Sequence, residues 1–127
     1  MERKIGLAIV GTGSISRLHT QGIQRLDCAE LVAVCDVHQS QIDWYTNLYP
    51  IAADRCYTDY DEMLKRDDVD AVIVCTNDTT HCDLSVRAMR AGKDVLCEKP
   101  MAINSEEAKK MLDAAKRTGK TLTIGYQ

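Results

Sequence analysis

A short glycine-containing loop between an apolar run and a helical pattern is the first segment that could carry chemistry. It reads Gly11-Thr12-Gly13-Ser14-Ile15-Ser16 and directly follows the apolar residues 5–10. Gly11 would permit a tight turn, and Gly13 would let the backbone approach a pyrophosphate closely. Amide groups at the start of the following helix would then face the anion. The spacing predicts a phosphate-binding turn made by Gly11, Thr12, Gly13, Ser14 and Ile15, with the small Ser16 in the third position of the fingerprint.

Asp36 is the second residue whose place in the sequence indicates binding. It closes the apolar run 31–35, about 20 residues after the glycine loop, where a dinucleotide fingerprint carries an acidic residue. A carboxylate there can accept hydrogen bonds from the ribose hydroxyls of adenosine, and it would repel a 2′-phosphate. The expected cofactor is therefore NAD rather than NADP, although a positive charge at nearby His38 would soften this preference. The alternative is that Asp36 only caps the following helix.

A rigid frame must hold these residues, and the sequence predicts one from short apolar runs. The expected strands cover residues 5–10, 31–35, 55–57, 71–75, 95–97 and 121–125. Helices with apolar residues at helical spacing lie between the strands. Their apolar positions are Ile15, Leu18, Gly22, Ile23 and Leu26 in the first helix, Ile42, Tyr45 and Tyr49 in the second, and Ala108, Met111, Leu112 and Ala115 in the last.

Capping residues mark the ends of the remaining helices. Thr58 can cap a helix whose first turn is rich in acids, which suit the positive end of the helix dipole. The helix predicted over 79–91 is followed by Gly92, and Gly119 ends the last helix. Asn104 and Glu107 form a capping pair, since a glutamate at the third helical position can reach back to the cap.

The order of elements indicates the fold class. Strands alternate with helices, and the strands are too apolar to be exposed on one face, which is typical of a parallel sheet covered on both sides. Right-handed crossovers then favour an α/β, Rossmann-type doubly wound sheet of about six strands, with helices on both faces. The prediction is one dinucleotide-binding domain over residues 1–127.

Several segments together resemble the N-terminal, NAD(P)-binding domain of the Gfo/Idh/MocA oxidoreductases, the family of glucose–fructose oxidoreductase and inositol dehydrogenase. The resemblance covers essentially the whole chain. It rests on GTGSISRLH at 11–19, VCD at 34–36, VDAVIVCT at 69–76, His81, AGKDVLCEKP at 91–100 and IGYQ at 124–127. It implies a nicotinamide-dependent enzyme that oxidises or reduces sugars, cyclitols or similar polyols.

The triplet Glu98-Lys99-Pro100 receives its roles from this resemblance. Lys99 would be catalytic and lie near both nicotinamide and substrate, where an ammonium group stabilises a developing alkoxide. A surface lysine in a turn is the alternative for Lys99. Glu98 would either contact the cofactor or lock the turn. Pro100 would shape the turn, and the resemblance favours a cis Lys99–Pro100 bond.

The loop after the fourth predicted strand departs from the family pattern, because Asp78 stands where relatives often have a different residue. Thr76 and Asn77 are still expected to face the cofactor, whereas an acid at 78 is unfavourable near phosphates unless it turns away. His81 is a candidate cofactor-binding residue, but packing or hydrogen bonding at a helix start is the favoured role. His19 is expected to pack within the first helix, and neither histidine is expected to bind a metal.

The family's substrate domain would follow the last strand, and this sequence ends at residue 127. The resemblance implies that the missing domain supplies an aspartate and a histidine that work with Lys99, and a β-sheet that pairs subunits into a homo-oligomer. We therefore expect a part of a longer enzyme that binds dinucleotide but does not turn over a polyol by itself.

Composition excludes several classes of function. The formal net charge is −3, from 16 basic and 19 acidic residues, so there is no basic footprint for nucleic acid. The apolar run near the N-terminus is too short for a membrane span or a signal peptide. Cys35, Cys75 and Cys97 lie in apolar runs, and no pair of cysteines has Cys-x-x-Cys spacing. We expect a reduced, cytoplasmic protein without a metal site.

Two alternatives keep the fold and change the function. One is a non-catalytic regulatory protein that senses NAD(P) through the same site, against which the intact Glu98-Lys99-Pro100 triplet argues. The other is a Rossmann domain for a different adenosine ligand, such as a methyl donor, which would leave Lys99 without a role.

Overall fold

Six parallel strands form the sheet of the computed structural model, which describes residues 2–126. In chain order they are β1 Ile5–Val10, β2 Ala29–Cys35, β3 Cys56–Tyr57, β4 Ala71–Val74, β5 Asp94–Glu98 and β6 Leu122–Gly125. In space their order is β3-β2-β1-β4-β5-β6, and each neighbouring pair is parallel. The predicted Rossmann-type sheet is confirmed, and each of the six predicted runs contains or overlaps one strand.

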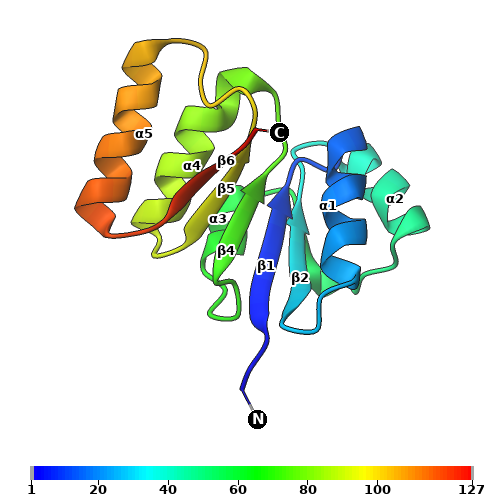
Figure 1. Cartoon of the computed structure of the whole chain (residues 1–127). Helices are drawn as coiled ribbons and strands as arrows, with labels where there is room; N and C mark the ends of the chain where they lie inside the picture. The colour runs from blue at the N-terminus through cyan, green and yellow to red at the C-terminus, as the bar shows by residue number, and fades with distance from the viewer. Residues whose placement is uncertain (1, 127) are drawn as a thin grey trace.

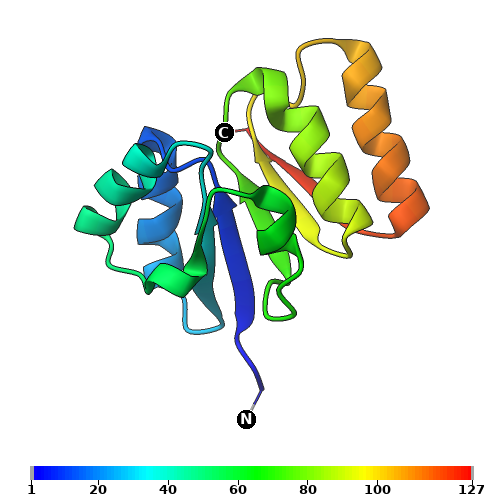
Figure 2. The ribbon, with the colours of Figure 1, turned by 180° about the vertical axis from the view of Figure 1, so that it is seen from behind.

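Helices cover both faces of this sheet. They are α1 Ser14–Gln24, α2 Gln39–Leu48, α3 Tyr60–Leu64, α4 His81–Arg90 and α5 Ser105–Thr118, with short 3-10 turns η1 Ala53–Arg55 and η2 Asp78–Thr80. The two opposite views show α1 and α2 on one face, and α3, α4 and α5 on the other (Figures 1 and 2). Because all strands are parallel, their carboxyl ends lie at the same end of the sheet, between the two helical layers.

Alternate residues of each central strand enter two separate cores. Ala8 and Val10 of β1 pack with α3, α4 and α5, whereas Ile9 between them packs with α1 and α2. In β4, Val72 and Val74 belong to the first core and Ile73 to the second. Burial on both faces explains why these strands appear in the sequence as unbroken apolar runs.

The predicted apolar faces of two helices were partly wrong. Leu18 and Leu26 of the first predicted helix are 64% and 48% exposed, and Leu112 of α5 is 50% exposed. The buried face of α1 is instead formed by Ser16, Thr20 and Ile23. Small hydroxyl side chains suit a close helix–sheet contact because their oxygens can bond nearby backbone carbonyls.

Ser16 Oγ donates to the Gly13 carbonyl at 2.5 Å, and Thr20 Oγ1 donates to the Ser16 carbonyl at 2.8 Å. The Thr20 hydroxyl also lies 2.5 Å from the Tyr45 hydroxyl of α2. Every buried oxygen in this set has a partner, so burial of these polar groups is not penalised.

One predicted cap residue and one predicted capping bond differ from the structure. Asp59 rather than Thr58 caps α3, and its side chain accepts hydrogen bonds from the amides of the first turn. Asn104 caps α5 by accepting from the Glu107 amide at 2.9 Å, as predicted. The predicted return bond from the Asn104 amide to the Glu107 carboxylate does not form, and Glu107 Oε2 is buried without a partner. Gly92 and Gly119 adopt positive φ angles at their helix ends.

Asp70 ties the N-terminal segment to the start of β4, and this contact gives a pH-dependent prediction. Its carboxylate accepts two hydrogen bonds from the Arg3 guanidinium, at 2.7 and 2.9 Å, and one from the Gly6 amide at 2.7 Å. The hydrogen-bonded Arg3 is the main cause that lowers the pKa of Asp70.

Asp70→Asn should lower the free energy of unfolding by about 1 kcal/mol at pH 7. The lowered pKa means that this stabilisation is present above the usual aspartate range and is lost as the pH falls through the folded pKa. Urea unfolding should therefore show a smaller difference in unfolding free energy between wild type and Asp70→Asn at pH 3 than at pH 7. The control Asp67→Asn, at an exposed position, should change little at either pH. An equal loss at both pH values would contradict this account.

Candidate dinucleotide-binding site

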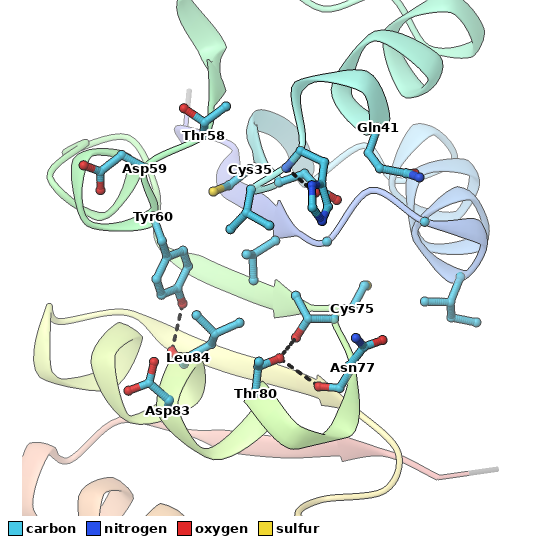
Figure 3. A pocket seen from close by; sticks show the side chains of 18 of the residues that line it. Cys35, Gln41, Thr58, Asp59, Tyr60, Cys75, Asn77, Thr80, Asp83 and Leu84 are labelled. Atoms are coloured by element: carbon cyan, nitrogen blue, oxygen red, sulfur yellow. Dashed lines mark hydrogen bonds between the residues drawn. The ribbon is translucent and has the colours of Figure 1, made fainter.

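A cavity of about 900 Å³ opens at the carboxyl ends of β1, β2 and β4. It lies where the chain order reverses, because β1 has β2 on one side and β4 on the other. Open α/β sheets bind ligands at this position, since the loops that follow neighbouring strands turn to opposite faces and leave a crevice. Side chains from both halves of the sheet line it (Figure 3).

The glycine turn forms one wall of the cavity. Gly11 has a φ of +90°, its amide donates to the Cys35 carbonyl at 2.8 Å, and a Cβ there would lie 2.7 Å from the Cys75 carbonyl carbon. At Gly13 the situation is opposite, since no atom lies within 4 Å of an added Cβ. Gly11 is thus required by packing, and Gly13 keeps a space open at the start of α1, where amide groups favour an anion.

The Asp36 carboxylate joins the glycine turn to the start of α2. Oδ2 accepts from the Thr12 amide at 2.9 Å and from Thr12 Oγ1 at 3.1 Å, and Oδ1 accepts from the His38 amide at 2.9 Å. His38 rather than Asp36 is the cap residue of α2, although the Asp36 carboxylate accepts from the amide of that residue. A carboxylate has about four acceptor sites, and the three bonds above use most of them, so Asp36 keeps capacity for about one ligand hydroxyl in the cavity that it lines.

The loop after β4 forms the opposite wall. Thr76, Asn77 and Thr80 line the cavity, and the Thr80 hydroxyl lies 2.6 Å from Thr76 Oγ1 and 2.8 Å from the Asn77 carbonyl (Figure 3). Asp78 is exposed and does not line this cavity. The acid that departs from the family pattern therefore turns away from the place where phosphates are expected.

His81 lies behind this wall rather than on it. The residue is 1% exposed, with Nδ1 2.7 Å from the Pro100 carbonyl oxygen and Nε2 3.0 Å from the Thr76 carbonyl oxygen. The expected hydrogen bonding at a helix start is confirmed, since α4 begins at His81. The imidazole does not line the cavity, so it can act on a ligand there only through Thr76.

The triplet at the end of β5 stands beside the cavity, next to the β4 loop. Lys99 is exposed, and its bond to Pro100 is cis. Glu98 Oε2 accepts from the Lys99 amide at 3.3 Å, while Glu98 Oε1 lies 2.6 Å from His19 Nε2. Glu98 therefore holds the turn in this structure. The contact with His19 was missed by the sequence reasoning, which gave that residue a packing role.

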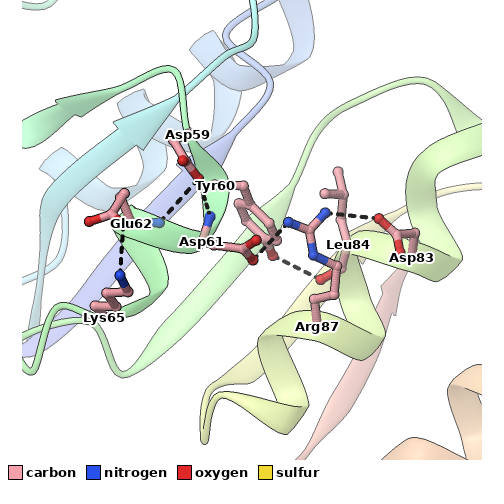
Figure 4. A network of polar contacts seen from close by, with 8 residues as sticks. All are labelled: Asp59, Tyr60, Asp61, Glu62, Lys65, Asp83, Leu84 and Arg87. Atoms are coloured by element: carbon pink, nitrogen blue, oxygen red, sulfur yellow. Dashed lines mark hydrogen bonds and ion pairs between the residues drawn. The ribbon is translucent and has the colours of Figure 1, made fainter.

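A polar network closes the far end of the cavity, and the sequence reasoning did not find it (Figure 4). The Tyr60 hydroxyl of α3 donates to the Leu84 carbonyl of α4 at 2.8 Å. The Arg87 guanidinium lies over the Tyr60 ring and pairs with Asp61 at 2.7 Å and with Asp83 at 3.0 Å. Asp83 and Arg87 are four residues apart on α4, but the contacts of Arg87 with Asp61 and of Tyr60 with Leu84 join distant parts of the sequence and follow no local pattern.

The cysteine thiols beside the cavity are chemically quiet. Burial raises the pKa of both Cys35 and Cys75 to about 12, so neither carries a reactive thiolate near neutral pH. All six cysteines are free thiols. Across residues 2–126, no cluster of three histidine, cysteine or acidic side chains is placed to hold a metal ion. Within the same range, no helix is both long and apolar enough to cross a membrane.

Together, the sheet order, the glycine turn and the strand-ending acid beside a cavity define a dinucleotide-binding domain of the Rossmann type. Comparison with known proteins is more specific. The model of the Gfo/Idh/MocA oxidoreductase family, NAD-binding Rossmann fold, matches residues 5–126. The chain belongs to this family, which confirms the resemblance seen in the sequence.

Individual relatives agree with this assignment. Inositol 2-dehydrogenase of Klebsiella pneumoniae is 33% identical over 122 residues, which are 94% of this chain and 36% of the relative. An NAD-binding protein from Listeria innocua matches with a TM-score of 0.88 at 30% identity, over 97% of this chain and 35% of its own. The WlbA dehydrogenase from Bordetella pertussis, solved with NADH and UDP-GlcNAcA, matches with a TM-score of 0.88 at 32% identity, over 96% of this chain and 37% of its own. The chain spans about a third of the length of these proteins.

The two glycines of the turn should respond differently to an added methyl group. Gly11→Ala should destabilise the protein by about 2 kcal/mol or more, because it combines a positive φ with a clash against the Cys75 backbone. Gly13→Ala should leave stability within about 0.5 kcal/mol of wild type and weaken NAD binding by at least about tenfold, because its methyl enters the open cavity.

Thermal unfolding and calorimetric titration of the two variants separate these effects. If Gly13→Ala bound NAD as tightly as wild type, the pyrophosphate would not lie against this turn.

Proposed function

We propose that this chain binds NAD(H) in preference to NADP(H), as the cofactor domain of a dehydrogenase that acts on a hydroxyl group of a sugar, cyclitol or related polyol. Membership of the family supports the cofactor class. Relatives named as inositol 2-dehydrogenases, and one solved with NADH and a nucleotide sugar, support the class of substrate. The free thiols fit a reducing compartment such as the cytoplasm.

The open space at Gly13 is the observation that carries the proposal. It lies beside the first amides of α1 and on the wall of the cavity, so the pyrophosphate can approach the backbone without displacing a side chain. Ser14 and Ile15 continue this wall. Thr12 is fully buried and acts from beneath by bonding Asp36. On the facing wall, Thr76 and Asn77 would contact the same ligand.

The charges around the cavity favour NAD over NADP. Asp36, Asp59 and Asp83 all line it, and each would repel a 2′-phosphate. Arg87 also lines the cavity, but it is already paired with Asp61 and Asp83. Val37 lines the same region and is 77% exposed, which suits contact with the flat face of an adenine ring.

Lys99 would supply the polar chemistry at the neighbouring strand end. When bound, the nicotinamide ring supplies the hydride acceptor. The proton of the substrate hydroxyl must leave as well, and the Lys99 ammonium would stabilise the negative charge that develops on that oxygen. Exposure of Lys99 beside the loop of Thr76 and Asn77 supports this role.

Cofactor preference can be measured by calorimetric titration of the protein with NAD and with NADP in one buffer. We expect tighter binding of NAD. In Asp36→Ala the ratio of the two affinities should fall by at least about tenfold, because the repulsion of the 2′-phosphate is removed. NAD itself should also bind more weakly, since Asp36 holds Thr12 of the glycine turn.

Asp27→Ala is the matched control for this titration. Asp27 is exposed just before β2, at the opposite edge of the sheet, and its removal changes the net charge equally. An affinity ratio that responds alike to both substitutions would contradict the role of Asp36, and no binding of either dinucleotide would contradict the proposed function.

The role of Lys99 can be tested in an active enzyme that contains this domain. Lys99→Met should lower kcat by about 10²- to 10⁴-fold, the usual contribution of acid–base groups, while the Kd for NAD changes little. Steady-state kinetics with a polyol substrate and cofactor titration measure the two quantities. A variant with near wild-type kcat would show that Lys99 is only a surface residue of the turn.

A further inference from the structure

The turn Glu98–Pro100 is held by an imidazole on each side. His19 of α1 contacts the Glu98 side chain at one end, and His81 of α4 contacts the Pro100 carbonyl at the other. Lys99 lies between these two contacts. The chain has three histidines, and two of them contact this three-residue segment.

The contact of His19 fixes the Glu98 carboxylate. The atoms Nε2 and Oε1 are 2.6 Å apart, and the two side chains are only 20% and 16% exposed. Glu98 Oε2 faces the Lys99 amide at 3.3 Å. The same carboxylate lies against β6, since a Cβ added at Gly125 would be 3.4 Å from Oε1. The carboxylate is thus enclosed by α1, by β6 and by its own turn.

The contact of His81 fixes the other end of the turn. Both ring nitrogens face carbonyl oxygens, Pro100 at 2.7 Å and Thr76 at 3.0 Å, in a site that is 1% exposed. The imidazole therefore bridges the loop after β4 and the turn after β5. Because both partners are backbone carbonyls, the imidazole fixes the main chain of the two segments rather than their side chains.

Each histidine belongs to a helix that borders the cofactor cavity. α1 contributes Ser14 and Ile15 to the wall, and the loop before α4 contributes Thr76 and Asn77. The turn that carries Lys99 does not line this cavity. The position of this turn relative to the cofactor therefore depends on its contacts with the elements that line the cavity. His19 supplies such a contact from α1, and His81 supplies one from α4.

We propose that His19 and His81 are positioning residues that fix the Glu98–Pro100 turn, and Lys99 with it, to the two elements that bind the cofactor. The significance for catalysis rests on the proposed function. The positioning itself is a property of the protein without any ligand, so it can be tested independently of NAD binding.

Amide substitutions separate the individual contacts. In His81→Asn the side-chain nitrogen replaces Nδ1 and keeps the contact with the Pro100 carbonyl, whereas in His81→Gln it replaces Nε2 and keeps only the contact with the Thr76 carbonyl. His19→Gln likewise retains a donor at the place of Nε2, and His19→Ala removes it. Backbone ¹⁵N relaxation of the Lys99 and Met101 amides then reports the order of the turn.

Wild type, His19→Gln and His81→Asn should show order parameters near 0.85 at Lys99, typical of rigid backbone. His19→Ala and His81→Gln should show values that fall toward about 0.6. Gln21→Ala and Arg90→Ala are matched controls on α1 and α4, because both side chains are exposed on the same helices and do not contact the turn; they should leave Lys99 unchanged.

A wild-type order parameter at Lys99 in both His19→Ala and His81→Gln would overturn the proposal. Equal loosening by His81→Asn and His81→Gln would also overturn it, because a packing role does not distinguish the two ring nitrogens. If the buried His81 variants fail to fold, the pair His19→Ala and His19→Gln decides. Titration with NAD on the same samples tests the proposed function separately, since a rigid turn without NAD binding would contradict only that function.

Discussion

The close approach of two backbones at the centre of the sheet determines the rest of this structure. Gly11 packs directly against the Cys75 peptide group, and the β1 and β4 ends are joined there by the hydrogen bond from the Cys75 amide to the Val10 carbonyl, at 2.8 Å. Because no side chain separates them, the glycine turn stays flat against the sheet and α1 starts close to the strand ends. The crevice between the two halves opens directly beside this contact, since Gly11 and Cys75 both line it.

Most of the architecture could be predicted from local patterns. Strands buried on both faces show as apolar runs, and the expected runs 5–10 and 71–75 match β1 and β4 closely. The buried face of α1 could not be predicted in this way. Ser16 and Thr20 count as polar in any periodicity analysis. Their burial is tolerated because both hydroxyl groups bond nearby backbone carbonyls, and Thr20 also contacts the Tyr45 hydroxyl of α2.

In the candidate site, too, residues with a local spacing pattern could be predicted and contacts between distant residues could not. Gly11, Gly13 and Asp36 follow a fixed spacing that reflects ligand geometry, so they were found from the sequence. The contact between His19 and Glu98 joins residues 79 positions apart, and no spacing rule indicates it. Arg87 was missed for a related reason, since its pairing with Asp61 depends on how α3 and α4 meet above the sheet. Local chemistry was predictable, and the contacts that orient it were not.

The free space beside Gly13 has a consequence for how this domain can diverge. A Cβ added at that position meets no atom within 4 Å, so packing does not require glycine there, and the bound ligand is what a larger residue would obstruct. Gly11 is constrained by folding itself. In a duplicated gene, one codon change at position 13 could therefore produce a stably folded protein that has lost its cofactor. Among natural sequences, we expect variation at position 11 to be limited by folding and variation at position 13 to be limited by ligand binding.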